Sequence, residues 1–128
     1  MGYRSDVTII AYPSKRHTGK FAMLKLYVDE NLPDEFEVVG EGDARYLHCN
    51  IEGVKWYEDY DTVQQYDKAF SEWDGMFTDP DPDPTQEHES MFHYEFMRVG
   101  EEYEDVGYHS SYGADHNLNL SREVYIDL

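Results

Sequence analysis

The first quarter of the chain changes from a strand-like to a helix-like pattern of apolar residues. Residues 6–12 (DVTIIAY) are β-branched and apolar on both faces, which predicts a short strand in the centre of a sheet. In residues 18–33, Phe21, Leu24 and Val28 recur at helical spacing, and a proline closes the segment. The pattern therefore predicts a central strand followed by an amphipathic helix.

Two further strands are predicted next. Residues 36–39 and 45–51 are strand-like runs, and the Gly-rich residues 40–43 between them favour a hairpin. Gly53 then indicates a bulge or a break before residues 54–57.

A second helix has the clearest pattern in the chain. Its apolar positions recur along one face: Val63, Tyr66, Phe70 and Trp73. Asp61 with Gln64 three residues later matches a capping box in its Asp variant, so Asp61 is predicted to be the N-cap. We expect this helix to lie on a sheet and to end near Gly75.

An acidic, Pro-rich loop is predicted at about residues 78–90. Alternate prolines in residues 78–84 remove backbone donors and hold the chain extended. A loop or linker between elements follows from that composition.

The C-terminal part predicts more strands. Residues 91–99 and 103–109 carry alternating side chains and predict a hairpin closed around residues 100–102. Residues 110–119 are polar and turn-rich, and residues 122–128 predict a last strand.

The order of these elements is typical of an α+β fold. The first six match the ferredoxin-like βαββαβ arrangement, and additional antiparallel strands extend it at the C-terminal end. We expect both helices on one sheet face, with the other face open to solvent or to a partner. A length of 128 residues fits a single domain, residues 1–128.

Charge changes this picture more than any motif does. The chain has 28 acids and ten bases, for a formal charge of -18, and residues 1–25 sum to +4 whereas residues 26–128 sum to -22. Such an excess argues against nucleic acid or an anionic membrane as a ligand. The 12 Tyr, six Phe and two Trp indicate a folded acidic protein rather than a disordered one.

Composition also bears on location. No apolar run is long enough to span a membrane, and residues 1–12 lack the features of a signal peptide. Cys49 is the only cysteine, so it has no internal disulfide partner, which suits a reducing cytosol.

The sequence predicts neither a metal site nor a cofactor. The six histidines are scattered, and His88 and His93, the nearest pair, lie in a turn-prone segment without a cysteine. The acids between Asp79 and Glu87 alternate with prolines and lack the glycine and glutamate positions of a calcium loop.

The sequence also does not predict an enzyme. Cys49 and His48 are neighbours in a predicted strand, where alternation sends them to opposite faces, and a buried Cys49 is expected. Pairs of carboxylates are too plentiful to single out as an acid–base pair. Gly40 and Gly42 lie among acids that would repel a phosphate.

Three dense acidic groups remain as candidates for binding a basic partner. They are Glu58, Asp59 and Asp61; residues 79–83 with Glu87 and Glu89; and Glu101, Glu102, Glu104 and Asp105. Tyr57, Tyr60 and Tyr103 lie among them, and tyrosine is favoured at the centre of interfaces. A folded surface of carboxylates can occupy a basic groove in place of DNA, which is DNA mimicry. The alternatives are that the acids provide solubility and that the Asp-Pro run is a stiff spacer.

Several blocks resemble a loose family of small proteins encoded by bacteriophages and prophages. They are residues 1–7 (MGYRSDV), 54–57 (VKWY), 94–101 (YEFMRVGE) and 104–106 (EDV). The family has no settled activity and no agreed binding residues, so the resemblance implies a setting, the cytoplasm of an infected bacterium. The acidic Pro-rich loop and residues 110–119 depart from the family pattern.

Three functional hypotheses follow. The first is a phage-encoded, non-enzymatic inhibitor that mimics DNA and binds a basic DNA- or RNA-handling defence complex of the host, such as a CRISPR or restriction system. The second is an adaptor or assembly protein that binds another protein through the open sheet face. The third is a pocket for a small signalling nucleotide at four bases near the first helix, whose simpler role is to neutralise neighbouring acids: Lys15, Arg16, Lys20 and Lys25.

Overall fold

A computed structural model describes residues 4–57, 59–78, 90–100, 106–111, 114, 118–120 and 124–126. Eight of the predicted binding residues lie outside these ranges: Glu58, Glu87, Glu89, Glu101, Glu102, Tyr103, Glu104 and Asp105. The other four, Tyr57, Asp59, Tyr60 and Asp61, are described.

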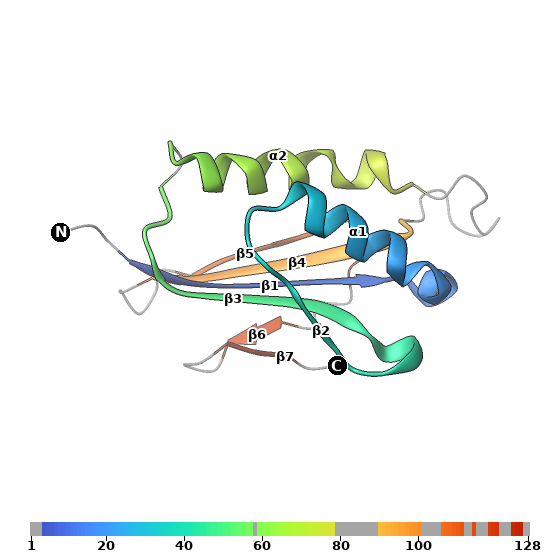
Figure 1. Cartoon of the computed structure of the whole chain (residues 1–128). Helices are drawn as coiled ribbons and strands as arrows, with labels where there is room; N and C mark the ends of the chain where they lie inside the picture. Colours follow the sequence, from blue (N-terminus) through green and yellow to red (C-terminus); the bar gives the residue numbers. More distant parts are fainter. Residues whose placement is uncertain are drawn as a thin grey trace.

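Among the described residues, five strands form one antiparallel sheet in the order β2-β3-β1-β4-β5 (Figure 1). The strands are β1 (Ser5–Pro13), β2 (Glu37–Val39), β3 (Tyr46–Val54), β4 (Phe92–Gly100) and β5 (Val106–Ser110). The predicted α+β class is confirmed, because the same residues also contain the helices α1 (Phe21–Asn31) and α2 (Asp61–Met76).

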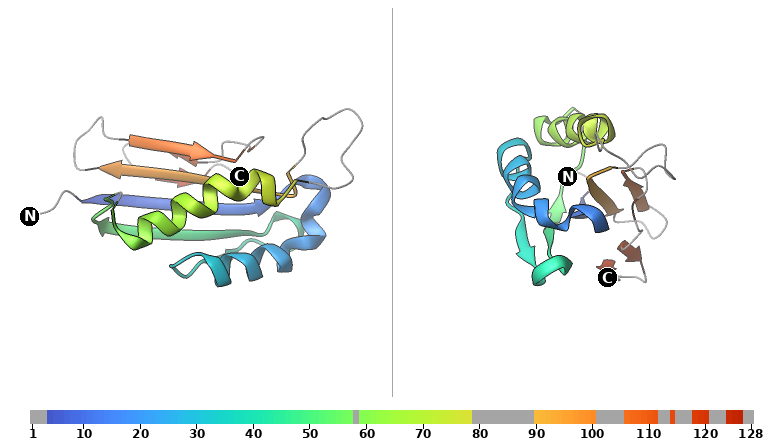
Figure 2. Two further views of the ribbon diagram at one scale, coloured as in Figure 1. Left: turned by 90° about the horizontal axis from the view of Figure 1, so that it is seen from above. Right: turned by 90° about the vertical axis from the view of Figure 1, so that its right-hand side faces the viewer.

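Strand β1 is central, as the sequence predicts, and this explains its apolar character on both faces. Val7, Ile9 and Ala11 pack in one core cluster with residues of both helices, such as Leu24 and Phe70. Figure 1 shows α1 and α2 above the sheet, and Figure 2 shows them side by side from above. Since the strand is paired on both edges and covered on its helix side, few of its positions tolerate a polar side chain.

The first helix begins later than the sequence predicts. Residues before Phe21 form a 3₁₀ helix, η1 (Lys15–Lys20), and His17 interrupts it with φ -122° and ψ 18°. Three of the four clustered bases therefore lie on η1 rather than on the first turn of α1. The fourth base, Lys25, lies on α1 and forms an ion pair with Asp29 at 2.7 Å.

Two glycines shape the strands as the sequence suggests. Gly40, between β2 and β3, has φ +87°, and an added Cβ there would lie 2.7 Å from the carbonyl oxygen of Ala44. Gly53 has φ +63° and lies where the β1–β3 register shifts, so β3 continues through a bulge to Val54 instead of breaking.

The second sheet face is not open at its centre, which corrects the sequence-based expectation. Ile10 and Glu95 on this face are both 0% exposed, and Met97 is also buried. The predicted last strand does not join the main sheet. Instead β7 (Val124–Ile126) pairs with β6 (Leu118–Leu120), a strand that the sequence does not predict, and this pair lies below the sheet in Figure 1.

Candidate partner-binding surface

Four predicted binding residues come together in the connection between β3 and α2. We call Tyr57, Asp59, Tyr60 and Asp61 the aromatic-acidic turn. The backbone N–H of Tyr60 donates to the carbonyl of Tyr57 at 3.0 Å, and the two rings meet edge to face with centroids 5.3 Å apart. Tyr60 is 42% exposed, and both aspartates are exposed. The turn therefore presents aromatic and carboxylate groups side by side.

Side chains packed in or against the core hold this turn in place on both sides. Before it, Trp56 packs against Tyr66 and Phe96, with ring centroids 5.6 Å and 5.4 Å apart. After it, Val63 and Tyr66 are buried in the first turns of α2. Because both ends are anchored in the core, the turn loses little conformational entropy when a partner binds.

The helix start differs by one residue from the prediction. The N-cap of α2 is Tyr60, not Asp61, and the carbonyl of Tyr60 accepts the first helical hydrogen bond from Gln64 at 3.0 Å. Asp61 occupies the first helical position, where the helix dipole still favours a negative charge. Asp61 is exposed to solvent at this position.

The bulge in β3 adds charges at the same end of the sheet. Asp6 Oδ1 accepts a hydrogen bond from the Gly53 N–H at 2.8 Å, and Arg4 Nη1 donates to the Gly53 carbonyl at 2.7 Å. Glu52 beside them is exposed. This end therefore carries several acids together with Arg4 and Lys55.

The three predicted acidic groups are not all attached to the same end of the sheet. Ser5 pairs with both Val54 and Gly100, so the aromatic-acidic turn and the start of residues 101–105 leave the same end of the sheet. Residues 79–89 instead leave the opposite end, where Thr78 bridges to Ser90. The nine residues of β1 separate these ends by about 27 Å.

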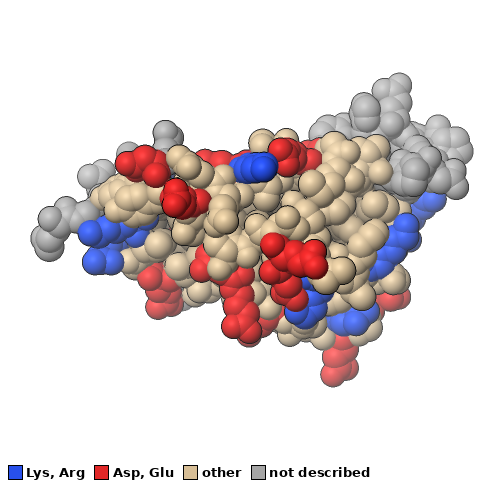
Figure 3. Space-filling model, turned by 45° about the horizontal axis from the view of Figure 1, so that its top comes forward, with Lys and Arg blue, Asp and Glu red and all other residues tan. Residues whose placement is uncertain are grey.

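Charge on the described surface is mixed. Fifteen of the 28 acids and nine of the ten bases lie among the described residues, so these carry a formal charge of -6 of the total -18. Figure 3 shows Asp and Glu side chains in separate groups, with Lys and Arg among them. The described part of this face thus lacks one continuous acidic surface.

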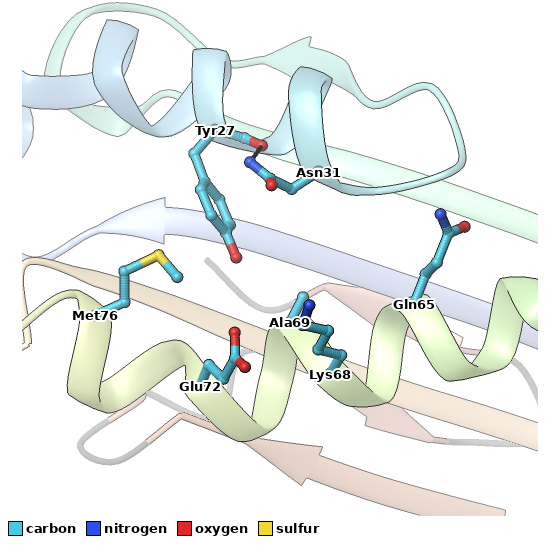
Figure 4. Close-up of a pocket in the computed structure, with 7 residues that line it drawn as sticks. All are labelled: Tyr27, Asn31, Gln65, Lys68, Ala69, Glu72 and Met76. Carbon is cyan, nitrogen blue, oxygen red and sulfur yellow. Dashed lines mark hydrogen bonds between the residues drawn. The ribbon is translucent and has the colours of Figure 1, made fainter.

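A groove lies between α1 and α2 and was not predicted. Its volume is about 230 Å³, and Figure 4 shows the seven residues that line it: Tyr27, Asn31, Gln65, Lys68, Ala69, Glu72 and Met76. The Tyr27 ring contacts Trp73 and Phe77 at centroid distances of 5.8 Å and 4.9 Å. Burial, with a smaller effect of Glu72, raises the pKa of the Tyr27 hydroxyl, so this group stays protonated.

A buried polar cluster occupies the second sheet face and was also not predicted. Tyr12 and Tyr108 donate hydrogen bonds to the two carboxylate oxygens of Glu95, at 2.6 Å and 3.1 Å. Nearby, His93 Nδ1 lies 3.2 Å from Ser111 Oγ. Burial and the Glu95 charge raise the pKa of Tyr108 to about 12, so its hydroxyl remains a donor. The two hydrogen bonds offset the water that fully buried Glu95 has lost, so the cluster has a structural role.

The cysteine is in an unreactive setting. Cys49 is buried in the core cluster as predicted, and burial is the main cause that raises its pKa to about 11. His48 lies in the next position of β3, and its Nδ1 is 3.0 Å from Glu37 Oε1 on the other face. The two side chains therefore form no thiolate–imidazole pair.

The described residues contain neither a grouped set of metal-binding side chains nor a helix that could span a membrane. In the part of the chain that the structure describes, no three His, Cys, Asp or Glu side chains are grouped to hold a metal ion. The described helices are too short or too polar to cross a membrane.

No protein-family model, curated protein or solved structure matches the chain.

Proposed function

We propose that the aromatic-acidic turn binds Lys or Arg side chains of a basic partner protein. The observation that carries this proposal is the exposure of two carboxylates and of Tyr60, whose ring contacts the half-buried Tyr57, on a turn anchored in the core at both ends. Carboxylates accept strong charge-assisted hydrogen bonds from basic groups, and tyrosine faces attract cations. A rigid site of this kind favours association with a groove lined by Lys and Arg.

We further propose that the protein is a phage-encoded inhibitor that binds a DNA- or RNA-handling defence complex by DNA mimicry, in the cytoplasm of the bacterial host. The net charge of -18 and the resemblance to phage proteins support this proposal. Within this proposal, the DNA-like surface includes the end of the sheet that carries the turn, where Asp59 and Asp61 lie exposed beside Tyr60. No catalytic step is part of this function.

The same proposal includes a ferredoxin-like core. The strand order β2-β3-β1-β4 and the contribution of both helices to one core cluster support that assignment. In this arrangement β5 is an addition at the edge of the sheet. In such a core, the connection between β3 and α2 joins two packed elements, so a binding turn there is held in a fixed position.

The test is recovery of a host partner with two variants of equal charge. Asp59→Lys with Asp61→Lys reverses the charge of the turn, whereas Glu41→Lys with Asp43→Lys makes the same change at the exposed 3₁₀ helix η2 (Gly42–Ala44). We expect at least tenfold lower recovery from host lysate for the first variant and less than threefold loss for the second. For the wild type, recovery should fall between 0.05 and 0.5 M salt by about tenfold or more, because exposed charges are screened.

Two results would contradict the proposal. Equal losses in the two variants would show that only net charge matters, and unchanged recovery of the turn variant would exclude the turn. Recovery that is independent of salt would exclude an electrostatic partner.

The structure does not favour the two alternatives. An adaptor that uses the second sheet face has little surface at the centre of that face, because Ile10 and Glu95 are fully buried. A nucleotide site at the clustered bases has only Lys20, the N-cap residue of α1, at the helix N-terminus, because Lys15 and Arg16 lie earlier on η1.

A further inference from the structure

A hydrogen bond connects the segment after α1 with the first turns of α2. The hydroxyl of Tyr66, a fully buried residue of α2, donates to Asp34 Oδ2 at 2.7 Å. Asp34 is half-buried in the connection between α1 and β2, where Leu32 and Phe36 on either side of it are buried. Seen from above in Figure 2, α1 ends beside the start of α2. Asp34 is therefore held in place by its buried neighbours and can fix the position of the hydroxyl.

The hydroxyl of Tyr66 stays protonated and needs an acceptor. Burial, followed by the hydrogen bond to Asp34 and the charge of that residue, raises the pKa of Tyr66 far above its usual range. A buried phenol that loses its acceptor is left with an unsatisfied polar group, which is costly. The bond to Asp34 therefore determines where the ring of Tyr66 lies.

The ring of Tyr66 contacts the residue that leads into the aromatic-acidic turn. Its centroid lies 5.6 Å from that of Trp56, with the two planes tilted by 36°. Trp56 is only partly buried, and Tyr66 and Phe96 are its ring contacts among the described residues. Since Trp56 directly precedes Tyr57, the Tyr66 ring controls how the chain enters the turn.

Tyr66 also controls how the chain leaves the turn. The carbonyl of Tyr60 accepts a hydrogen bond from the N–H of Gln64 at 3.0 Å, which ties the turn to the start of α2. Tyr66 follows on the same helix, where Phe70 packs against it with ring centroids 5.8 Å apart. A shift of the Tyr66 ring would therefore displace both ends of the turn.

Ring packing alone does not specify this arrangement. Apolar contacts are non-directional, whereas a hydrogen bond restricts both a distance and an angle. A phenylalanine ring in place of Tyr66 keeps the apolar contacts but is free to slide against Trp56. Asp34 thus supplies the directional contact in a cluster that is otherwise aromatic.

We infer that Asp34 is a positioning residue for the aromatic-acidic turn. It acts through the ring of Tyr66 and through Trp56, and it keeps Tyr57 and Tyr60 in the arrangement that binds a basic side chain. The inference rests on the proposed function, because that function assigns partner binding to the turn. It adds a determinant of binding that lies outside the turn, on another connection of the fold.

The test compares the loss of one buried hydroxyl on each side of the sheet. Tyr66→Phe removes the donor to Asp34, and the control Tyr12→Phe removes a donor to Glu95 on the second sheet face. Both substitutions leave the net charge unchanged, so neither alters long-range attraction to a partner. Asp34→Ala and Asp34→Asn form a second pair, in which only asparagine retains an oxygen acceptor.

Hydrogen exchange of the full-length protein measures the positioning without a partner. The reporter is the Tyr60 amide, which donates to the Tyr57 carbonyl at 3.0 Å. We expect this amide to exchange about fivefold faster than in wild type in Tyr66→Phe and Asp34→Ala. In Tyr12→Phe and Asp34→Asn it should stay within about twofold of wild type.

Recovery of the partner from host lysate measures the consequence for binding. Tyr66→Phe and Asp34→Ala should lower recovery about fivefold, because a loosened turn loses more conformational entropy when it binds. Tyr12→Phe and Asp34→Asn should stay within about twofold of wild type. Urea denaturation compares the stability of the two phenylalanine variants. Should Tyr66→Phe fail to fold, the two Asp34 variants give the same comparison.

Unchanged exchange of the Tyr60 amide in Tyr66→Phe, or equal acceleration in Tyr12→Phe, would overturn the inference. Equal impairment of Asp34→Asn and Asp34→Ala would also overturn it, because the acceptor oxygen would then not be the cause. Faster exchange with unchanged recovery would separate the hydrogen bond from binding and have the same result. A wild type that recovers no partner would refute the proposed function alone, since the exchange measurement contains no host protein.

Discussion

Among the described charged residues, Glu95 is the most completely buried. Its side chain is fully buried in the middle of β4, and Tyr12 and Tyr108 donate hydrogen bonds to its two carboxylate oxygens. Burial of a carboxylate is unfavourable unless strong hydrogen bonds replace its lost water. These hydrogen bonds hold Glu95, Tyr12 and Tyr108 in one arrangement and so favour a single packing of the second sheet face.

Replacement of Glu95 by alanine should destabilise the protein by about 2–4 kcal/mol, because the buried hydroxyl of Tyr12 and the half-buried hydroxyl of Tyr108 lose their acceptor. Glu95→Gln should have a smaller effect, since an amide oxygen still accepts one bond. Urea denaturation measures both, with the exposed Glu30→Ala as control, for which a change within about 0.5 kcal/mol is expected. A Glu95→Ala protein as stable as the control would contradict a structural role for the cluster.

Alternation along a strand could predict some residue environments but not others. It separates Cys49 from His48, whereas the burial of Cys49 was predicted correctly from the apolar character of cysteine. It also assigns Glu95 to the face opposite Tyr94 and Phe96. It could not show that this face is covered, because the cover depends on the packing of distant segments rather than on local periodicity.

At the scale of elements, the end of β3 determines where the candidate turn lies. The bulge at Gly53 shifts the register with β1, and hydrogen bonds from Arg4 and to Asp6 hold both polar groups of the glycine backbone. The chain then leads through Trp56 into the turn and α2. Correct placement of Tyr57 and Tyr60 thus depends on a left-handed backbone conformation four residues before the turn.

Gly53→Ala should cost about 1–2 kcal/mol of stability, because φ +63° is unfavourable for a residue with a Cβ. The matched control is Gly75→Ala in α2, where an added Cβ meets no atom within 4 Å and alanine should stabilise the helix by about 0.5–1 kcal/mol. The unfolding temperatures of the two variants should therefore shift in opposite directions relative to the wild type. A shift of both in the same direction would contradict the assigned conformation of Gly53.

Sequence patterns predicted the presence of these elements more accurately than their first and last residues. Helical spacing identified α2 correctly, since Val63, Tyr66 and Trp73 are all buried. The N-cap was predicted one residue late, because Asp61 is a good residue for both the cap and the first helical position. The strand β6 was not predicted, because a three-residue strand among polar residues has too little periodicity to be recognised.

At the scale of the whole molecule, the charge of -18 opposes the compact state. The described residues carry only -6 of it, so most of the excess belongs to residues 79–89, 101–105 and the other undescribed positions. Composition could predict an acidic protein, but it could not predict that two of the acidic groups leave opposite ends of β1. That separation follows from the antiparallel topology.

Added salt should stabilise the protein, because screening weakens repulsion among like charges. We expect the unfolding temperature at pH 7 to rise by several degrees, roughly 3–8 °C, between 0.01 and 0.3 M NaCl. The turn variant Asp59→Lys with Asp61→Lys, which carries less net charge, should show a smaller rise. A decrease with salt in the wild type would instead indicate that attractive ion pairs dominate its electrostatics.

The pairing of Ser5 with Gly100 has a consequence for synthesis on the ribosome. The strand made first is the centre of the sheet, and one of its neighbours is translated almost a hundred residues later. The nascent chain therefore has to keep β1 unpaired on one edge until β4 has left the exit tunnel, so protection by a chaperone during translation is most valuable for β1.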